Sequence, residues 1–114
     1  MNLARSVAAL SVVAALGLGG CATQQRFEFG SYDAALYAYS KHPDELPRFE
    51  KALEDAISKG RAGGHIAPGL QAELGYCYLG EGKRAEALAL FKAEMADFPD
   101  SRQFLSKIVE QNAG

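Results

Sequence analysis

The side chains that could bind a metal or take part in catalysis are few and scattered along the chain. His42 and His65 stand in expected connections, and neither has a second His or Cys at the spacing of a metal site. Glu50, Glu54 and Asp55 fall on one expected helix, where carboxylates are typical of a solvated face. No Ser or Cys stands out as a nucleophile with a general base at hand. The sequence therefore predicts no catalytic site, no metal site and no cofactor, and we do not expect an enzyme.

Cys21 is the residue with the clearest expected chemistry. It follows a basic residue near the start, Arg5, and an apolar run from Val7 to Leu18, the layout of an export signal. The run is too short for a membrane span, which needs about 20 apolar residues. The sequence LGGC at 18–21 resembles the lipobox of bacterial lipoproteins. This resemblance implies removal of residues 1–20 and acylation of the Cys21 sulfur, for example with palmitate; the alternative is an ordinary secretory signal.

The residue after this cysteine is Ala22 and not Asp. By resemblance to lipoprotein sorting in Gram-negative bacteria, this favours the outer membrane, facing the periplasm. Residues 21–30 then form the lipidated N-terminus and a polar linker. The linker carries Phe27 and Phe29, which either pack on the folded domain, the interpretation we favour, or bind a partner.

Length and charge bound the remaining possibilities. The chain has 114 residues, enough for one domain. The formal net charge of −2, without a basic patch, gives no indication of a nucleic-acid partner.

The stretch from Leu70 to Pro99 carries the strongest structural signal. An apolar stripe recurs at helical spacing, with polar residues expected to face water. The stripe consists of Leu70, Leu74, Cys77 and Tyr78, and the polar residues are Gln71, Glu73 and Glu81. Gly75 lies inside this helix and predicts the close approach of a neighbouring helix, on which Ala87 is the matching small residue. Cys77 is expected to be a buried thiol rather than a reactive or intermolecular one.

A turn and a second helix complete this stretch. Gly80-Glu81-Gly82 supplies two residues able to take a positive φ. The second helix is expected from about Lys83 to Asp97, with Ala87 and Phe91 on its apolar face. Pro99 ends it, because the residue before a proline is pushed out of the helical region.

The spacing in these two helices resembles the tetratricopeptide repeat, a helix-turn-helix unit of about 34 residues. The matching pattern is Leu74-Gly75-x2-Tyr78, then Ala87-x3-Phe91, then Pro99. The resemblance implies an all-α fold of helical hairpins, with these residues in structural roles. It also implies a partner-binding surface on the concave side of the first helix, at Ala72, Tyr76 and Leu79. Tyr76 is the expected anchor, unless it covers the preceding hairpin; Tyr37, off the stripe of an earlier helix, marks a second candidate surface.

Two positions depart from the repeat pattern. Gln71 stands where the family has Trp, and Glu94 stands where a small apolar residue is usual. We expect a structural role for Glu94. Its carboxylate should accept hydrogen bonds from backbone donors around 101–103, or pair with Arg102.

Further helices are expected on both sides of this hairpin. One begins with Ser31 as its N-cap and ends near His42-Pro43. The next begins with Asp44 as its N-cap and runs to Lys59, with Gly60 in the left-handed position after its end. The connection at 60–68 is expected to be flexible.

A last helix, with Asp100 or Ser101 as its N-cap, is expected to run to about Gln111 as a C-terminal cap on the array. Its expected inner face consists of Phe104, Leu105, Ile108 and Val109. The prediction is thus a helical domain of about five helices at 31–111, after a signal peptide at 1–20 and a linker at 21–30. Five helices form a small core, so association into a homo-oligomer would be unsurprising.

The chain as a whole resembles a family of short, uncharacterised bacterial lipoproteins with repeat-like helices, on the residues Phe29-Gly30-Ser31-Tyr32 and the run 68–104. Members of that family tend to accompany a lipoprotein similar to the curli secretion channel. The resemblance implies a lipid-anchored, non-enzymatic adaptor that holds other envelope lipoproteins or secretion components. The alternative is an inhibitor or activator of a cell-wall enzyme that binds through the same helices.

Overall fold

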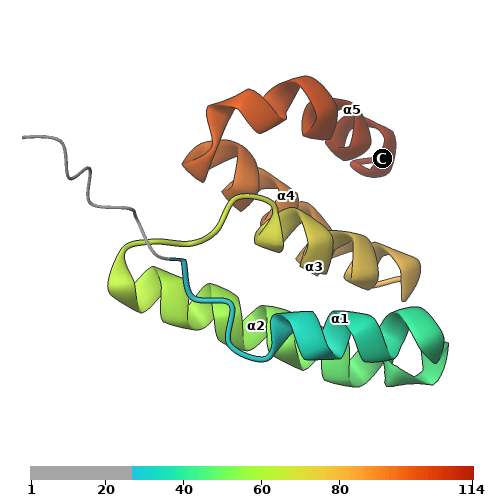
Figure 1. Cartoon of the computed structure of the whole chain (residues 1–114). Coiled ribbons are helices and arrows are strands. Elements are labelled where there is room, and N and C mark those ends of the chain that lie inside the picture. The colour runs from blue at the N-terminus through green and yellow to red at the C-terminus, as the bar shows by residue number, and fades with distance from the viewer. Residues whose placement is uncertain (1–26) are drawn as a thin grey trace, which may run out of the picture.

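The structure is a computed structural model that describes residues 27–114, and these residues are all-α (Figure 1). The helices are α1 (Tyr32–Lys41), α2 (Leu46–Gly63), α3 (Leu70–Gly80), α4 (Arg84–Asp97) and α5 (Arg102–Asn112), with 3₁₀ turns η1 (Pro43–Glu45) and η2 (Pro99–Ser101). Successive helices run in opposite directions, and each packs on its neighbours in the chain (Figure 1). The predicted all-α fold of five helices with a C-terminal helix is confirmed.

Aromatic side chains hold α1 against α2. Phe49 of α2 is buried, and its ring lies between two rings of α1, with centroid distances of 5.8 Å to Tyr32 and 5.3 Å to Tyr39. Ala35 is buried between these tyrosines on the same face of α1. The apolar stripe predicted for this helix therefore faces α2.

The predicted N-cap position is right for the first helix and wrong for the second. Ser31 is the N-cap residue of α1, and its backbone oxygen accepts from Ala35 N at 3.0 Å, but its side chain makes no capping hydrogen bond. Asp44 lies inside η1, which leads directly into α2, so no side chain caps that helix either. The short 3₁₀ turn replaces a cap by continuing the chain into the helix.

The predicted end of the second helix is also wrong. α2 continues past Gly60 to Gly63 and ends at Gly64, whose φ of +78° is the left-handed conformation that Gly60 was expected to adopt. Gly60 is buried because the following loop folds back over it. A Cβ at Gly60 would lie only 2.9 Å from the backbone oxygen of His65. The connection is therefore shorter than predicted and packed, with Ala67 buried in it.

The hairpin of α3 and α4 has the predicted close approach. A Cβ on Gly75 would lie 2.7 Å from Cε1 of Phe91, and both Phe91 and Ala87 are fully buried. In the turn only Gly82 uses a positive φ, +79°, because Gly80 is the last residue of α3. α4 ends at Asp97, two residues before Pro99, as expected.

The last helix, α5, packs on α4 and leaves its outer face open. Leu105 is buried, and Ile108 and Val109 pack against the same core. The prediction that Phe104 faces inward is wrong, because its side chain is 68% exposed. Among the described α-helices, only α4 contacts α5. One neighbouring helix covers less of the α5 surface than the four predicted inner-face residues span.

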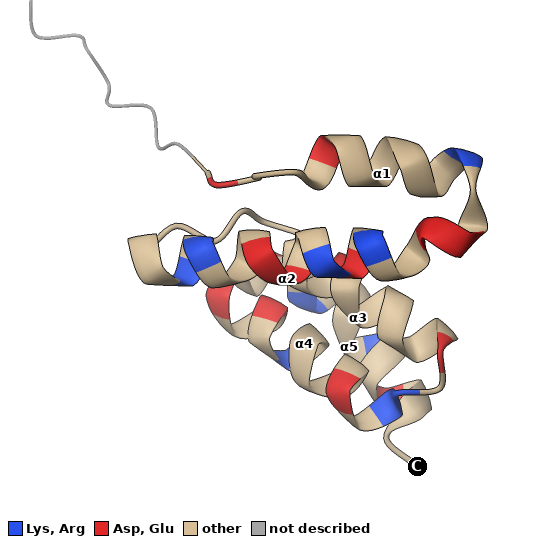
Figure 2. Ribbon diagram, turned by 90° about the horizontal axis from the view of Figure 1, so that it is seen from below, with Lys and Arg blue, Asp and Glu red and all other residues tan. Residues whose placement is uncertain are grey.

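Two apolar cores meet at α3. The first core joins α1, α2 and α3, and the second joins α4 and α5 with the other side of α3; Tyr78 contacts both. Acidic and basic residues are interspersed along α2, α4 and α5 (Figure 2). The continuous packing through α3 fixes the positions of the side chains described next.

Candidate functional site

The predicted partner-binding residues lie on α3, but they are not equally accessible. Ala72 and Leu79 are partly buried against the second core. Tyr76 is 50% exposed, and its ring packs edge-on against Phe91 of α4, with the ring centroids 5.1 Å apart. The described ring contact of Tyr76 is thus with the second hairpin and not with the first. Tyr76 is therefore a half-exposed aromatic residue whose ring is held in place by Phe91.

The second candidate surface lies on the outer side of α1. Tyr37 is 68% exposed. Lys41 Nζ lies 5.7 Å from the centroid of its ring, a cation–π contact within one helix. Tyr37 is therefore more exposed than Tyr76 but less firmly packed.

Two tyrosines tie α3 to the first hairpin. Tyr78 Oη donates to Glu54 Oε1 of α2 at 2.5 Å, and Tyr32 Oη of α1 donates to Glu73 Oε2 at 2.7 Å. The hydrogen bond to Glu54, with burial second, raises the pKa of Tyr78 to about 12. Burial, with the bond to Glu73 second, raises the pKa of Tyr32 to about 12. Glu73, which was expected to face water, is therefore an acceptor between helices.

Gln71 was also expected to face water, but the structure buries it between helices. Its side chain is fully buried. Gln71 Oε1 accepts from Arg61 Nη2 of α2 at 3.2 Å, and Gln71 Nε2 donates to Asp97 Oδ2 of α4 at 2.9 Å. A residue at the position where the repeat family has Trp thus joins three helices by hydrogen bonds.

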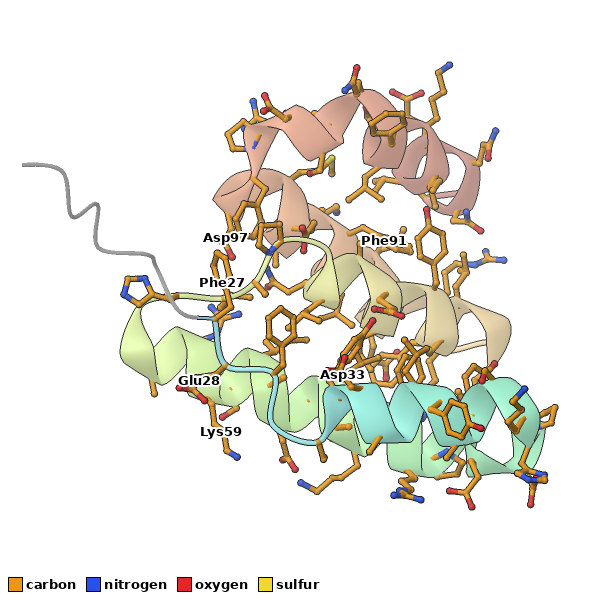
Figure 3. All side chains as sticks on the ribbon, viewed as in Figure 1. Phe27, Glu28, Asp33, Lys59, Phe91 and Asp97 are labelled. Atoms are coloured by element: carbon orange, nitrogen blue, oxygen red, sulfur yellow. The ribbon has the colours of Figure 1, made fainter. Side chains whose placement is uncertain are left out.

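Arg61 and Asp97 also line a cleft of about 370 Å³ at one end of the molecule. Its lining consists of Phe27, Arg61, Gly64, His65, Ile66, Asp97 and Phe98. Phe27 and Asp97 lie at this end, where the described part of the chain begins (Figure 3). The cleft was not predicted, because its walls come from three segments far apart in the sequence.

The linker aromatics pack on the domain, as favoured from the sequence. Phe27 contacts the first core. Ring contacts continue from Phe27 to Phe29, with centroids 6.4 Å apart, and from Phe29 to Tyr32 at 6.0 Å. The entry of the chain into the domain is thereby fixed by a row of rings.

Glu94 has the kind of role that was predicted, but with another helix. Its side chain is 2% exposed, and Oε1 accepts from Gly69 N, at the N-terminal end of α3, at 2.6 Å. The predicted contacts with 101–103 or Arg102 are wrong. At that end of the chain, Ser101 Oγ donates to the backbone oxygen of Phe98 at 2.7 Å. Glu94 therefore supplies a carboxylate to the start of α3, where backbone amides lack partners within the helix.

Neither cysteine forms a described site. Cys21 lies outside the described residues, so its lipidation stays a prediction. Cys77 is a free, partly buried thiol, and burial raises its pKa, with a smaller effect from Glu73. Within residues 27–114, no cluster of three or more metal-ligating side chains occurs, and no helix has the length and apolarity to cross a bilayer.

A comparison with known families matches most of the described residues. A family model described as a domain of unknown function (DUF4810) matches residues 27–108. The chain belongs to this family. Among curated proteins and solved structures, none matches the chain. The matched residues begin at the first aromatic of the packed linker and end within α5, so the family unit includes both the cleft and the α3 surface.

Proposed function

We propose that this protein is a lipid-anchored adaptor on the periplasmic side of the outer membrane, which holds another cell-envelope protein against the exposed side of α3. The expected partners are other envelope lipoproteins or secretion components, including a lipoprotein similar to the curli secretion channel. Support comes from the sequence at Cys21 and from the arrangement of consecutive antiparallel helices, which is compatible with tetratricopeptide-like hairpins.

The observation that carries the proposal is the state of Tyr76. A half-exposed aromatic ring held by Phe91 can bind a partner without first losing side-chain freedom. Tyrosine is enriched among the residues that dominate protein interfaces, because it combines a large apolar ring with a polar tip. Tyr76 is therefore the proposed anchor, and Ala72 and Leu79 form its partly buried surroundings.

The packed aromatic residues at the start of the described chain extend this proposal beyond α3. Phe27, Phe29 and Tyr32 form a row of ring contacts that ends in the first core. A partner held at α3 would then keep a defined position relative to the chain that leads to Cys21. This is the property that distinguishes an adaptor from a module on a free tether.

The second candidate function is regulation of a cell-wall enzyme through the same surface. It shares the α3 anchor with the first proposal and differs in the partner. The identity of the captured protein therefore separates the two.

The test is isolation of partners from cross-linked membranes with three forms of the full-length protein. Tyr76→Ala should remove the partner, while Tyr37→Ala, which truncates the other exposed tyrosine, should retain it. Recovery of an envelope lipoprotein or secretion component supports the adaptor, and recovery of a hydrolase alone supports the regulator. Loss with Tyr37→Ala but not with Tyr76→Ala would place the binding surface on α1 and contradict the proposed anchor.

A further inference from the structure

The cleft between the ends of α2 and α4 contains one positive and one negative side chain that are held apart. Among the described residues, Arg61 and Asp97 are joined through Gln71 and not by an ion pair. Gln71 is fully buried, and its two hydrogen bonds hold Arg61 and Asp97 in place. Each retains capacity for a ligand, because a guanidinium has five N–H donors and a carboxylate has two oxygens.

The walls of this cleft add apolar surface to the two charges. Phe27, Ile66 and Phe98 line it together with Arg61 and Asp97. A volume of about 370 Å³ lies in the range of small-molecule sites, about 300–1,000 Å³. The complementary ligand is a small zwitterion, with an anion for Arg61, an ammonium group for Asp97 and a short carbon link.

The position of the cleft on the chain indicates where such a ligand would come from. Six residue steps separate Cys21 from Phe27 in the cleft wall. Fully extended, they span at most about 20 Å. With a lipid on Cys21, which belongs to the proposed function above, the cleft cannot lie far from the polar headgroups of the bilayer.

We infer that this cleft binds the phosphoethanolamine headgroup of a membrane phospholipid. The phosphodiester accepts hydrogen bonds from Arg61, whose planar guanidinium suits phosphate oxygens. The ammonium group donates to Asp97. Phe27, Ile66 and Phe98 contact the carbon atoms beside the headgroup. Binding in this way would orient the domain on the membrane and so set the direction in which α3 presents Tyr76.

The first test uses the soluble headgroup. Full-length protein in micelles of an uncharged detergent is titrated with sn-glycero-3-phosphoethanolamine, and backbone amide shifts are followed by NMR. We expect shifts at 64–66 and 97–98. Arg61→Gln and Asp97→Asn should each weaken binding by about tenfold or more, because each replaces a charged hydrogen-bonding group by a neutral one. The matched controls Arg102→Gln and Asp100→Asn change exposed charges outside the cleft and should bind normally.

Two comparisons identify the source of the zwitterion. sn-Glycero-3-phosphocholine should bind more weakly, because its quaternary ammonium has no N–H to donate to Asp97. In nanodiscs, the same amide shifts should appear with phosphatidylethanolamine and be absent with phosphatidylcholine. Equal binding of free alanine would assign the cleft to amino acids and overturn the headgroup. Absence of shifts at the cleft, or binding by both cleft variants as tight as that of the unaltered protein, would overturn the site itself.

Failure of this inference leaves the adaptor proposal testable. Partner capture depends on Tyr76, which does not line the cleft, and is measured with Tyr76→Ala and Tyr37→Ala. A protein that captures its partner but shows no shift with either headgroup would retain the adaptor function and lose only the lipid site.

Discussion

Gly75 leaves the space that the Phe91 ring fills, and this contact fixes the second hairpin. The same Phe91 ring packs against Tyr76. A change at Gly75 that moves Phe91 would therefore also move the proposed binding residue. Because Phe91 is fully buried, it has little freedom to move away from an added methyl group.

Gly75→Ala should therefore destabilise the protein although alanine favours helix. Overpacking should lower the free energy of unfolding by about 1–3 kcal/mol, partly offset by about 1 kcal/mol of helix propensity. Gly80→Ala is the control in the same helix, since nothing lies within 4 Å of its added Cβ. Urea unfolding should show loss for the first variant and no loss for the second; equal stability of the two would contradict the close contact.

Glu94 is the second residue whose role can be measured alone. Glu94→Gln keeps an oxygen for Gly69 N–H, whereas Glu94→Met fills similar space without an acceptor. The Met variant should lose about 1–3 kcal/mol, the cost of leaving an amide unsatisfied, and the Gln variant less. Thermal melting of both variants checks this. Equal losses would show that the charge, and not the hydrogen bond, carries the effect.

At the scale of elements, apolar periodicity sufficed to predict the helices, because a stripe such as Leu70, Leu74 and Tyr78 is a local property of the sequence. Helix ends were less predictable. The neighbours of Gly60 in the sequence suggest a helix end. In the structure, its lack of a side chain instead allows the loop at His65 to pack closely against the helix. The difference arises from tertiary packing, which no local pattern contains.

The polar residues of α3 were mispredicted for a related reason. Gln71 and Glu73 are spaced like surface residues, yet their partners lie far away in the chain: Arg61, Asp97 and Tyr32. The exposure of Tyr76, the proposed anchor of the candidate surface, could be predicted because Tyr76 lies off the apolar stripe of α3. The cleft required knowledge of how the helices are stacked, so the sequence offered no signal for it beyond the unexpected Gln71.

The hydrogen bonds from Tyr32 to Glu73 and from Tyr78 to Glu54 should make the stability of the fold fall at alkaline pH. Tyr32 and Tyr78 have pKa values raised from 10.0 to about 12, so their neutral forms are favoured in the folded state. Their contribution is fully present below pH 10 and is lost as pH rises toward 12. Unfolding midpoints measured from pH 8 to pH 12 should fall above about 10, and less steeply in Tyr32→Phe and Tyr78→Phe. An unchanged slope in both variants would contradict the raised values.

For the whole molecule, we propose that one modified cysteine joins the helical domain to a membrane. Mass spectrometry of the processed natural protein should show a chain that begins at an acylated Cys21. Cys21→Ala should abolish the lipid and release the protein from membranes, whereas Cys77→Ala should retain both lipid and membrane association. A processed protein with an unmodified Cys21 would contradict the proposed lipid anchor.

Site-specific photo-cross-linking in living cells would show whether the exposed side of α3 holds an envelope protein, as proposed. A photoreactive amino acid is placed at residue 76 in one strain and at residue 37 in another, and the adducts are identified by mass spectrometry. We expect a discrete adduct with an envelope lipoprotein or secretion component at residue 76 and none with that partner at residue 37. Absence of any adduct at residue 76, or the same adduct at both positions, would contradict it.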